Sequence, residues 1–545
     1  MMMEKEAVTT RVEASHPGPY GRTKRNYDDD DEYNEEIVVG EKPSRFEVWG
    51  WCVYELCSYM VQSVVIPVVF PLIISQLQQL STDDETLRHQ WISDHHGMPC
   101  PQKQILLYSK LTKRTINITG SHFSSLEWTS IAWGGGLLLA APILGFISFH
   151  LDANQLYAII TAAATGVGVF FCLPAGFFKT TKIFIPYIAG IALAATVASA
   201  AHTHYLALML RPYGKPTPTL RRRTRFFPRL CISSRLSVYA TTFGLLGAAI
   251  VSSLTYHMLR EPSDRNLLSL WVVSIFSGLI WLAGVLHVVL VSPNRSSTIS
   301  SISPLSSRLY HSLSLFKYPN AIGGLVGVFL SSFATMSIFT GGVLFVVGQL
   351  CMMPVVNLLF LWLVYFLFPL VSLPLLQVMQ HFMRVNSVKM QILGFMLSMF
   401  SSGSGFYFSE SSWRWSHLLL FGAVQGTSTG LLNAFGRVLV LNCAPCGKEG
   451  AFSAWYGWVR SVGLCVGFTV GSVVAGRIRT SLGAAFCSSI AGIVVLLFGN
   501  VSDVGGAVAA GHVAEDNSGD ISERPSSRSH VVASSGLDSK ESLSV

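Results

Sequence analysis

Long apolar segments alternate with short polar ones along most of this chain. Each is close to the roughly 17–25 apolar residues that a helix needs to cross a bilayer. Membrane β-strands would instead be about ten residues long with alternating polarity, and no segment has that pattern. The sequence therefore predicts an all-α membrane protein with twelve transmembrane helices, at 49–75, 126–149, 156–177, 183–209, 236–256, 267–291, 320–348, 354–378, 388–408, 416–443, 455–475 and 482–500.

Two interior segments are too polar to belong to these helices, residues 76–125 and residues 292–319. The second is rich in serine and separates six predicted helices from six others. We interpret it as a linker between an N-terminal half, 49–291, and a C-terminal half, 320–500.

Small residues recur at similar places in the two halves, which favours a duplicated six-helix unit. Small side chains at a spacing of four let helices approach closely. They occur in the fifth predicted helix and in the eleventh, which is the fifth helix of the second half: Ala240, Gly244, Gly247 and Ala248, and then Gly463, Gly467, Gly471 and Ala475.

Composition supports the membrane assignment and indicates an orientation. Hydrophobic residues make up 50% of the chain and charged residues 12%, whereas soluble proteins average about 25% charged. The net charge of +8 is concentrated in the arginine-rich loop at 210–235. Positively charged loops of membrane proteins stay in the cytosol. We therefore interpret this charge as a topology signal and predict no nucleic-acid partner.

The same rule predicts the position of the remaining polar segments. The linker and both tails, 1–48 and 501–545, are expected in the cytosol, with the tails disordered. The loop at 76–125 then lies on the luminal or extracellular side, where the Asn117-Ile118-Thr119 sequon makes Asn117 a candidate glycosylation site.

Polar residues inside two predicted helices are candidates for a cavity lining. Helical spacing brings those of the first helix close to one face, and those of the tenth follow each other at steps of four. They are Tyr54, Glu55, Ser58, Tyr59 and Gln62 in the first helix, and Gln425, Thr429, Asn433 and Arg437 in the tenth.

Glu55 is the most informative of these residues. It lies about 9–10 Å inside the Trp49 end of its helix at about 1.5 Å per residue. A carboxylate at that depth costs roughly 2.5–3.5 kcal/mol unless it meets water or a partner. We expect Glu55 to face a wet cavity, and to form an ion pair with Arg437 or with the gating charge Arg460 that breaks as the halves move. Alternatively, the two arginines extend to the membrane surface.

No constellation of an enzyme or a cofactor site is present. The chain has no Walker A, G-x-S-x-G or H-E-x-x-H motif, so we predict no enzyme, no cofactor and no catalytic residue. Its ten cysteines lack a disulfide spacing. Cys443-x-x-Cys446 and His202-x-His204 are weak metal patterns, and we predict no metal site.

Two stretches resemble the vacuole-effluxer-like family of the major facilitator superfamily, which includes autophagy-related vacuolar amino-acid effluxers. The first stretch, residues 50–55, reads GWCVYE, and Pro67 and Phe70 follow it. The second begins with Gln425-Gly426 and Arg437 and continues through 445–452 as PCGKEGAF. The turn at 146–152, in contrast, lacks the Lys or Arg usual in the superfamily.

This resemblance implies a major-facilitator-like fold and export of amino acids from a vacuole or lysosome lumen, coupled to protons and linked to autophagic recycling. The partners would be the lipid bilayer, a small-molecule substrate and protons. A plasma-membrane location stays open. A non-transporting sensor or scaffold on the same fold is the alternative function, and a membrane enzyme is a more remote one.

Overall fold

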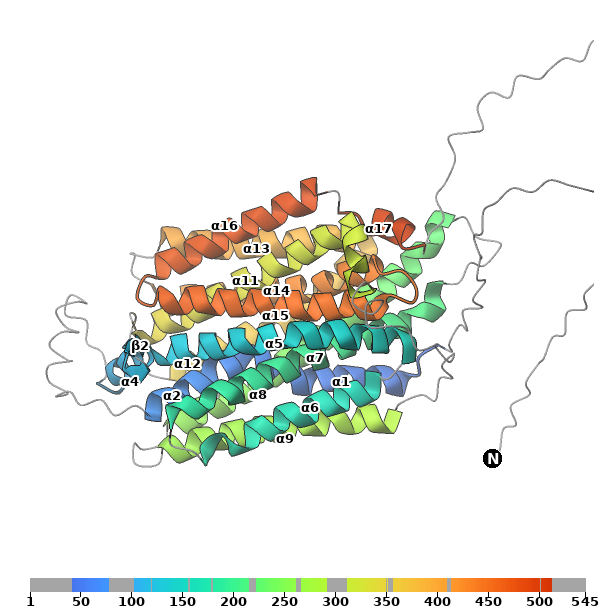
Figure 1. Ribbon diagram of the computed structural model, residues 1–545. Helices are drawn as coiled ribbons and strands as arrows, with labels where there is room; N and C mark the ends of the chain where they lie inside the picture. Colours follow the sequence, from blue (N-terminus) through green and yellow to red (C-terminus); the bar gives the residue numbers. More distant parts are fainter. Residues whose placement is uncertain are drawn as a thin grey trace, which may run out of the picture. The chain divides into compact units, whose positions relative to one another are not determined.

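The computed structural model describes residues 42–77, 102–118, 120–154, 157–177, 180–214, 222–260, 266–291, 311–348, 350, 356–408, 413–499 and 501–511. The chain divides into two units, Met1–Val39 and Gly40–Val545. The first unit, and with it most of the predicted N-terminal tail, lies outside the described residues. All of the structure below belongs to the second unit (Figure 1).

Every predicted apolar segment coincides with a helix, which confirms the all-α prediction. The first segment is composed of α1 (Arg45–Met60), a π-helix η1 (Val61–Val69) and α2 (Phe70–Leu77). The others are α5 (Ser125–Asn154), α6 (Tyr157–Cys172), α7 (Phe184–Leu210), α8 (Arg222–Arg260), α9 (Asn266–Val291), α11 (Pro319–Gly348), α12 (Val356–Met383), α13 (Ser387–Tyr407), α14 (Trp415–Asn442), α15 (Glu449–Val473) and α16 (Ile478–Phe498).

Among the described residues, eight helices are long and apolar enough to cross a membrane, and α6 and the middle of α9 are shorter apolar helices. Helices α13 and α15 are absent from both groups. Buried hydroxyls in α13 and Arg460 in α15 lower their hydropathy, but both pack among the apolar helices (Figure 1).

The first helix changes its winding where it passes the middle of the bundle. Ser44 and Glu47 form a reciprocal cap that starts α1, with bonds of 3.1 and 3.3 Å. Pro67 has no amide hydrogen, and its ring would clash with the Ser63 carbonyl in a regular α-helix. The π-helix η1 spans this position and holds Gln62 in its first turn. Such widened turns are frequent at functional sites.

Glycines in the fifth helix of each half allow close packing on the first helix of that half. In α8, a side chain at Gly247 would overlap the Leu56 carbonyl of α1, and one at Gly244 would press on Tyr59. In α15, Gly467 leaves the same kind of space for the Phe333 carbonyl of α11. The α1–α8 and α11–α15 contacts therefore repeat the same packing scheme, as the small-residue pattern predicts.

Shorter elements lie at the two ends of the helices. Helix α4 (Gln102–Thr112) and the antiparallel strands β1 (Ile116–Ile118) and β2 (Ser121–Phe123) mark one end, called here the hairpin end (Figure 1). Helix α17 (Asp503–Ala509) marks the opposite end, called the α17 end. Asn117 is exposed on β1, and Thr119 of its sequon lies outside the described residues.

Two predicted boundaries need correction. The basic loop at 210–235 is shorter than expected, because the short helix η4 (Arg211–Gly214) follows α7 directly and α8 already begins at Arg222. Arginine is a good helix former, so a charged sequence does not end a helix at the membrane surface. The predicted disordered tail from residue 501 instead starts with α17, whose Asp503 is buried.

Candidate functional site

An ion pair connects the first helix of the N-terminal half to α14 of the C-terminal half. Arg437 Nη2 lies 2.5 Å from Glu55 Oε1, and both side chains are almost fully buried. Gly244 of α8 leaves room for the Glu55 stem, since a Cβ there would come within 3.2 Å of Glu55 Cγ. Removing one partner of such a buried pair typically costs about 3–5 kcal/mol, because the other charge is left unpaired.

The second oxygen of Glu55 is held by His202 of α7. His202 Nδ1 lies 2.9 Å from Glu55 Oε2, and His202 Nε2 lies 3.0 Å from the Trp51 carbonyl oxygen. Both of these oxygens are hydrogen-bond acceptors, and only a doubly protonated imidazole donates from both ring nitrogens. The geometry therefore fits His202 in its charged form.

Trp51 fixes the orientation of this histidine. Its indole ring stacks on the imidazole with centroids 4.8 Å apart, and its Nε1 donates to the His202 carbonyl at 3.1 Å. The guanidinium carbon of Arg437 lies 5.8 Å from the centroid of the Trp51 ring. Glu55, His202 and Arg437 together hold one negative and two positive groups when the histidine is protonated.

This arrangement corrects the expectation that Glu55 faces water. Glu55 is 6% exposed, its carboxylate contacts His202 and Arg437, and it lines none of the described pockets. The cost of burial is offset by two partners rather than by solvent. The alternative pairing with Arg460 is not formed in this conformation.

A small polar pocket lies between α1, α11, α14 and α15. Its volume is about 320 Å³, open solvent included. Seven of the lining side chains carry a hydroxyl or an amide group, and Arg460 contributes the charge. The lining consists of Tyr59, Val328, Ser331, Ser332, Thr335, Thr429, Leu432, Asn433, Tyr456, Arg460 and Leu464.

Arg460 is held in this pocket by neutral groups. Its Nε donates to Asn433 Oδ1 at 3.0 Å, and its Nη1 donates to Gln62 Oε1 at 2.8 Å. Gln62 in turn donates to Ser461 at 2.9 Å, and the guanidinium lies 5.5 Å from the Tyr59 ring centre. Among the described residues, no carboxylate pairs with Arg460.

The remaining predicted residues lie apart from this pocket. Tyr54 is buried against α6, where its hydroxyl bonds to Thr165 at 2.8 Å. Ser58 is half-buried and lines none of the described pockets. Gln425 accepts from Ser401 at 2.5 Å within the C-terminal half, so the polar stripe of α14 is divided between two surroundings. Thr429 remains in the pocket and bonds to Tyr365 at 3.0 Å.

Further charged contacts join the halves closer to the α17 end. Arg211, after α7, forms a two-pronged ion pair with Glu449 at the start of α15, with bonds of 3.0 and 2.9 Å. Asp152, near the end of α5, accepts from the backbone N–H groups of Gly450 at 2.6 Å and Ala451 at 3.2 Å. A carboxylate is favoured there because a helix N-terminus has free N–H groups. His311 Nε2 lies 2.9 Å from the same carboxylate.

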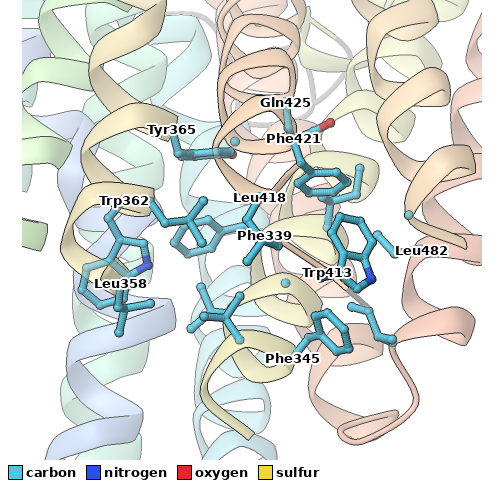
Figure 2. Close-up of a pocket in the computed structure, with 18 residues that line it drawn as sticks. Phe339, Phe345, Leu358, Trp362, Tyr365, Trp413, Leu418, Phe421, Gln425 and Leu482 are labelled. Carbon is cyan, nitrogen blue, oxygen red and sulfur yellow. The ribbon is translucent and has the colours of Figure 1, made fainter. Parts of the chain in front are cut away.

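Apolar pockets lie toward the hairpin end. One is formed by α11, α12, α14, α16 and Trp413, and its volume is about 720 Å³ with open solvent included. Figure 2 shows its aromatic lining, including Phe339, Trp362 and Trp413, with Gln425 at one edge. A second pocket shares Phe339 and Trp362 and also contacts Pro67 and Leu72 of the N-terminal half, so it lies between the halves.

Sequence reasoning missed several of these residues. The His202-x-His204 pattern indicates only weak metal binding, and among the described residues no three metal-ligating side chains come together. Asp152, Arg211 and Glu449 received no role, although Glu449 belongs to the PCGKEGAF stretch. An acidic residue after an apolar helix was the available signal for Asp152.

Comparisons with known proteins identify the fold. No protein-family model and no curated protein sequence matches the chain. Among solved structures, it is similar to the human organic anion transporter MFSD10, with a TM-score of 0.51 and 10% identity over 84% of this chain and 100% of that one. It is also similar to the proton:xylose symporter XylE, with a TM-score of 0.51 and 11% identity over 83% of this chain and 94% of that one. The chain therefore has the major facilitator fold, as the resemblance implies.

Proposed function

We propose that this protein is a secondary carrier of small organic solutes that works by alternating access. The observation that carries this proposal is the asymmetry of the contacts between the halves. Charged pairs join them toward the α17 end, a polar pocket lies beside these pairs, and an apolar pocket lies between the halves toward the hairpin end. A charged gate on one side of a central site is what rocking of two halves requires.

Within this proposal, the Glu55–Arg437 pair is part of the gate. It would form when the α17 end is closed and break when that end opens. Because the positive-inside rule assigns this end to the cytosol, the described conformation would be closed to the cytosol. The fold similarity to a xylose symporter and an organic anion transporter supports a small-solute substrate in general terms.

Amino acids are the substrate class that we propose, with export from the lumen of a vacuole or lysosome and a role in recycling after autophagy. The support is the resemblance of GWCVYE and PCGKEGAF to the vacuole-effluxer-like family. Proton coupling fits an acidic lumen, and Glu55 with His202 offers a carboxylate and an imidazole in direct contact. No observation favours the scaffold alternative.

Reconstitution tests the proposal. The purified chain is inserted into liposomes, and uptake of radiolabelled leucine is measured with and without an imposed pH gradient. We expect saturable uptake above that of empty liposomes, accelerated by the gradient. Uptake equal to empty liposomes for amino acids, sugars and organic anions alike would contradict a carrier. A fluorescent fusion in cells tests the vacuolar location separately.

A further inference from the structure

The polar pocket contains a positive charge that has no negative partner among the described residues. Arg460 is bonded only to the amide oxygens of Asn433 and Gln62, and its Nη2 donates to no described residue. Glu55, the one carboxylate of the described central site, is already neutralised by Arg437 and His202. The site therefore keeps an excess of positive charge. Arg460 is half-buried, and an anion that joins it would form a charge-assisted hydrogen bond.

A second polar atom of the pocket lacks a partner. Asn433 Nδ2 is buried and makes no hydrogen bond to any described residue, while its Oδ1 accepts from Arg460 and, at 3.4 Å, from Tyr456. An unsatisfied buried donor typically costs about 1–3 kcal/mol. The bond from Arg460 to Oδ1 holds the Asn433 side chain in its orientation. The orphan Nδ2 therefore belongs to the same cluster as the guanidinium.

The rest of the lining provides hydroxyls and aromatic rings. Ser332 and Thr335 line the pocket from α11, and the rings of Tyr59 and Tyr456 come from α1 and α15. The pocket is small in this conformation, so its occupant must be small. One planar guanidinium with one amide donor matches the two oxygens of a carboxylate.

We propose that Arg460 and Asn433 bind the carboxylate of a small organic acid or amino acid. This inference rests on the proposed function, because it names the group through which the carrier recognises its substrate. Arg460 donates to the carboxylate from Nη2, and Asn433 donates from Nδ2. Arg460 is thus a substrate-binding residue rather than part of the Glu55 gate. A solute that lacks the negative group leaves both donors unsatisfied and binds weakly.

Competition in proteoliposomes tests the chemical class. Uptake of radiolabelled leucine is challenged with 4-methyl-2-oxopentanoate, which keeps the carboxylate, and with leucinol, which lacks it. We expect the keto acid to compete and leucinol to be at least about tenfold weaker, which is the effect of losing roughly 1.4 kcal/mol. Equal competition by leucinol would overturn the inference while leaving the carrier intact.

Variants test the residues. Arg460→Gln should raise the KM for leucine at least about tenfold, and Arg460→Lys should raise it less because the charge remains. Arg235→Gln, which changes an exposed arginine bonded to Tyr239, is the matched control and should leave KM unchanged. An unchanged KM in Arg460→Gln would contradict the assignment.

A binding measurement separates this inference from the transport proposal. Asn433→Asp has nearly the same shape as the native residue and places a carboxylate beside Arg460, so the variant should fold but lose the site. We expect leucine and 4-methyl-2-oxopentanoate to raise the melting temperature of the purified native protein and not that of Asn433→Asp. If the native protein alone is stabilised but takes up no leucine, the binding site is supported and the carrier function is rejected. Equal stabilisation of both proteins would overturn the site.

Discussion

Arg437 of α14 and Glu55 of α1 are 382 residues apart in sequence, and their side chains meet at 2.5 Å between the two halves of the molecule. Each is buried, so neither charge is satisfied by solvent. His202 completes the cluster from α7. A contact of this kind is stable when the two helices are together and becomes costly when they separate. It therefore ties the charge state of the site to the relative position of the halves.

Glu55→Gln should loosen this contact and expose its surroundings. Cys52 lies one turn before Glu55 and is 4% exposed, so it reports on opening of the α17 end. We expect faster modification of Cys52 by a membrane-impermeant maleimide in the variant, measured by peptide mass spectrometry. The loss of one partner should also destabilise the fold by about 3–5 kcal/mol.

The double variant Glu55→Gln, Arg437→Gln controls for this effect. Because it removes both charges, we expect part of the lost stability to return, as a double-mutant cycle measures. Unchanged Cys52 labelling in Glu55→Gln would show that the pair does not hold the α17 end closed.

His202 should help to hold the halves together at the α17 end. Its two ring nitrogens contact Glu55 Oε2 and the Trp51 carbonyl oxygen, and a side chain without ring nitrogens loses both contacts. We expect faster Cys52 labelling in His202→Leu than in the native protein, measured at one fixed pH. Equal labelling rates would show that His202 does not hold this end closed.

Gly247→Ala tests the close packing of α8 on α1. The added methyl group would overlap the Leu56 carbonyl, which is backbone and cannot rotate away. Overpacking of this kind costs about 1–3 kcal/mol, so the melting temperature in detergent should fall. Gly134→Ala in α5 is the control, because a Cβ there meets no atom within 4 Å. Equal melting temperatures for the two variants would mean that α8 shifts to make room.

Asp503 should make stability depend on pH. Burial raises the pKa of its carboxyl from 3.8 to about 6, although the N–H groups of Ser387 and Val388 donate to it. The folded chain therefore holds this proton at pH values where the unfolded chain has released it. Its contribution to stability is complete below about pH 3.8 and is lost as pH rises through about 6.

The full effect is about 3 kcal/mol, from a difference of roughly two pKa units. Asp503→Asn cannot ionise, so its melting temperature relative to the native protein should rise between pH 4 and pH 7. A constant difference across this range would show that Asp503 titrates normally.

The helices could be predicted from sequence because a bilayer requires about twenty apolar residues per crossing, and each such segment is a helix here. The ends of α8 and the start of α17 could not be predicted in this way. Charged and polar residues occur in helices outside the membrane as well as in loops. Glu55, Arg437 and Arg460 lie at similar depths in their helices, which allowed two pairings for Glu55. The contact with Arg437 is the one that forms.

The other partners depend on tertiary structure. A histidine in an apolar helix gives no sign that a carboxylate 147 residues away in sequence faces it (His202 and Glu55). Likewise, the spacing of Gln425 and Asn433 places both in one polar stripe. Only the packing of α13 against α14 shows that Gln425 bonds within its own half.

Cross-linking across the α17 end tests the central claim most directly. Arg211 and Glu449 form an ion pair between the halves, and both are changed to cysteine in a chain whose native cysteines are replaced by serine. A short bis-methanethiosulfonate then joins the two positions, and leucine uptake is measured before cross-linking, after it, and after cleavage by a reductant. The account predicts that uptake stops in the joined protein and returns on cleavage, because the halves must separate there in each cycle. Undiminished uptake by fully cross-linked protein would contradict it.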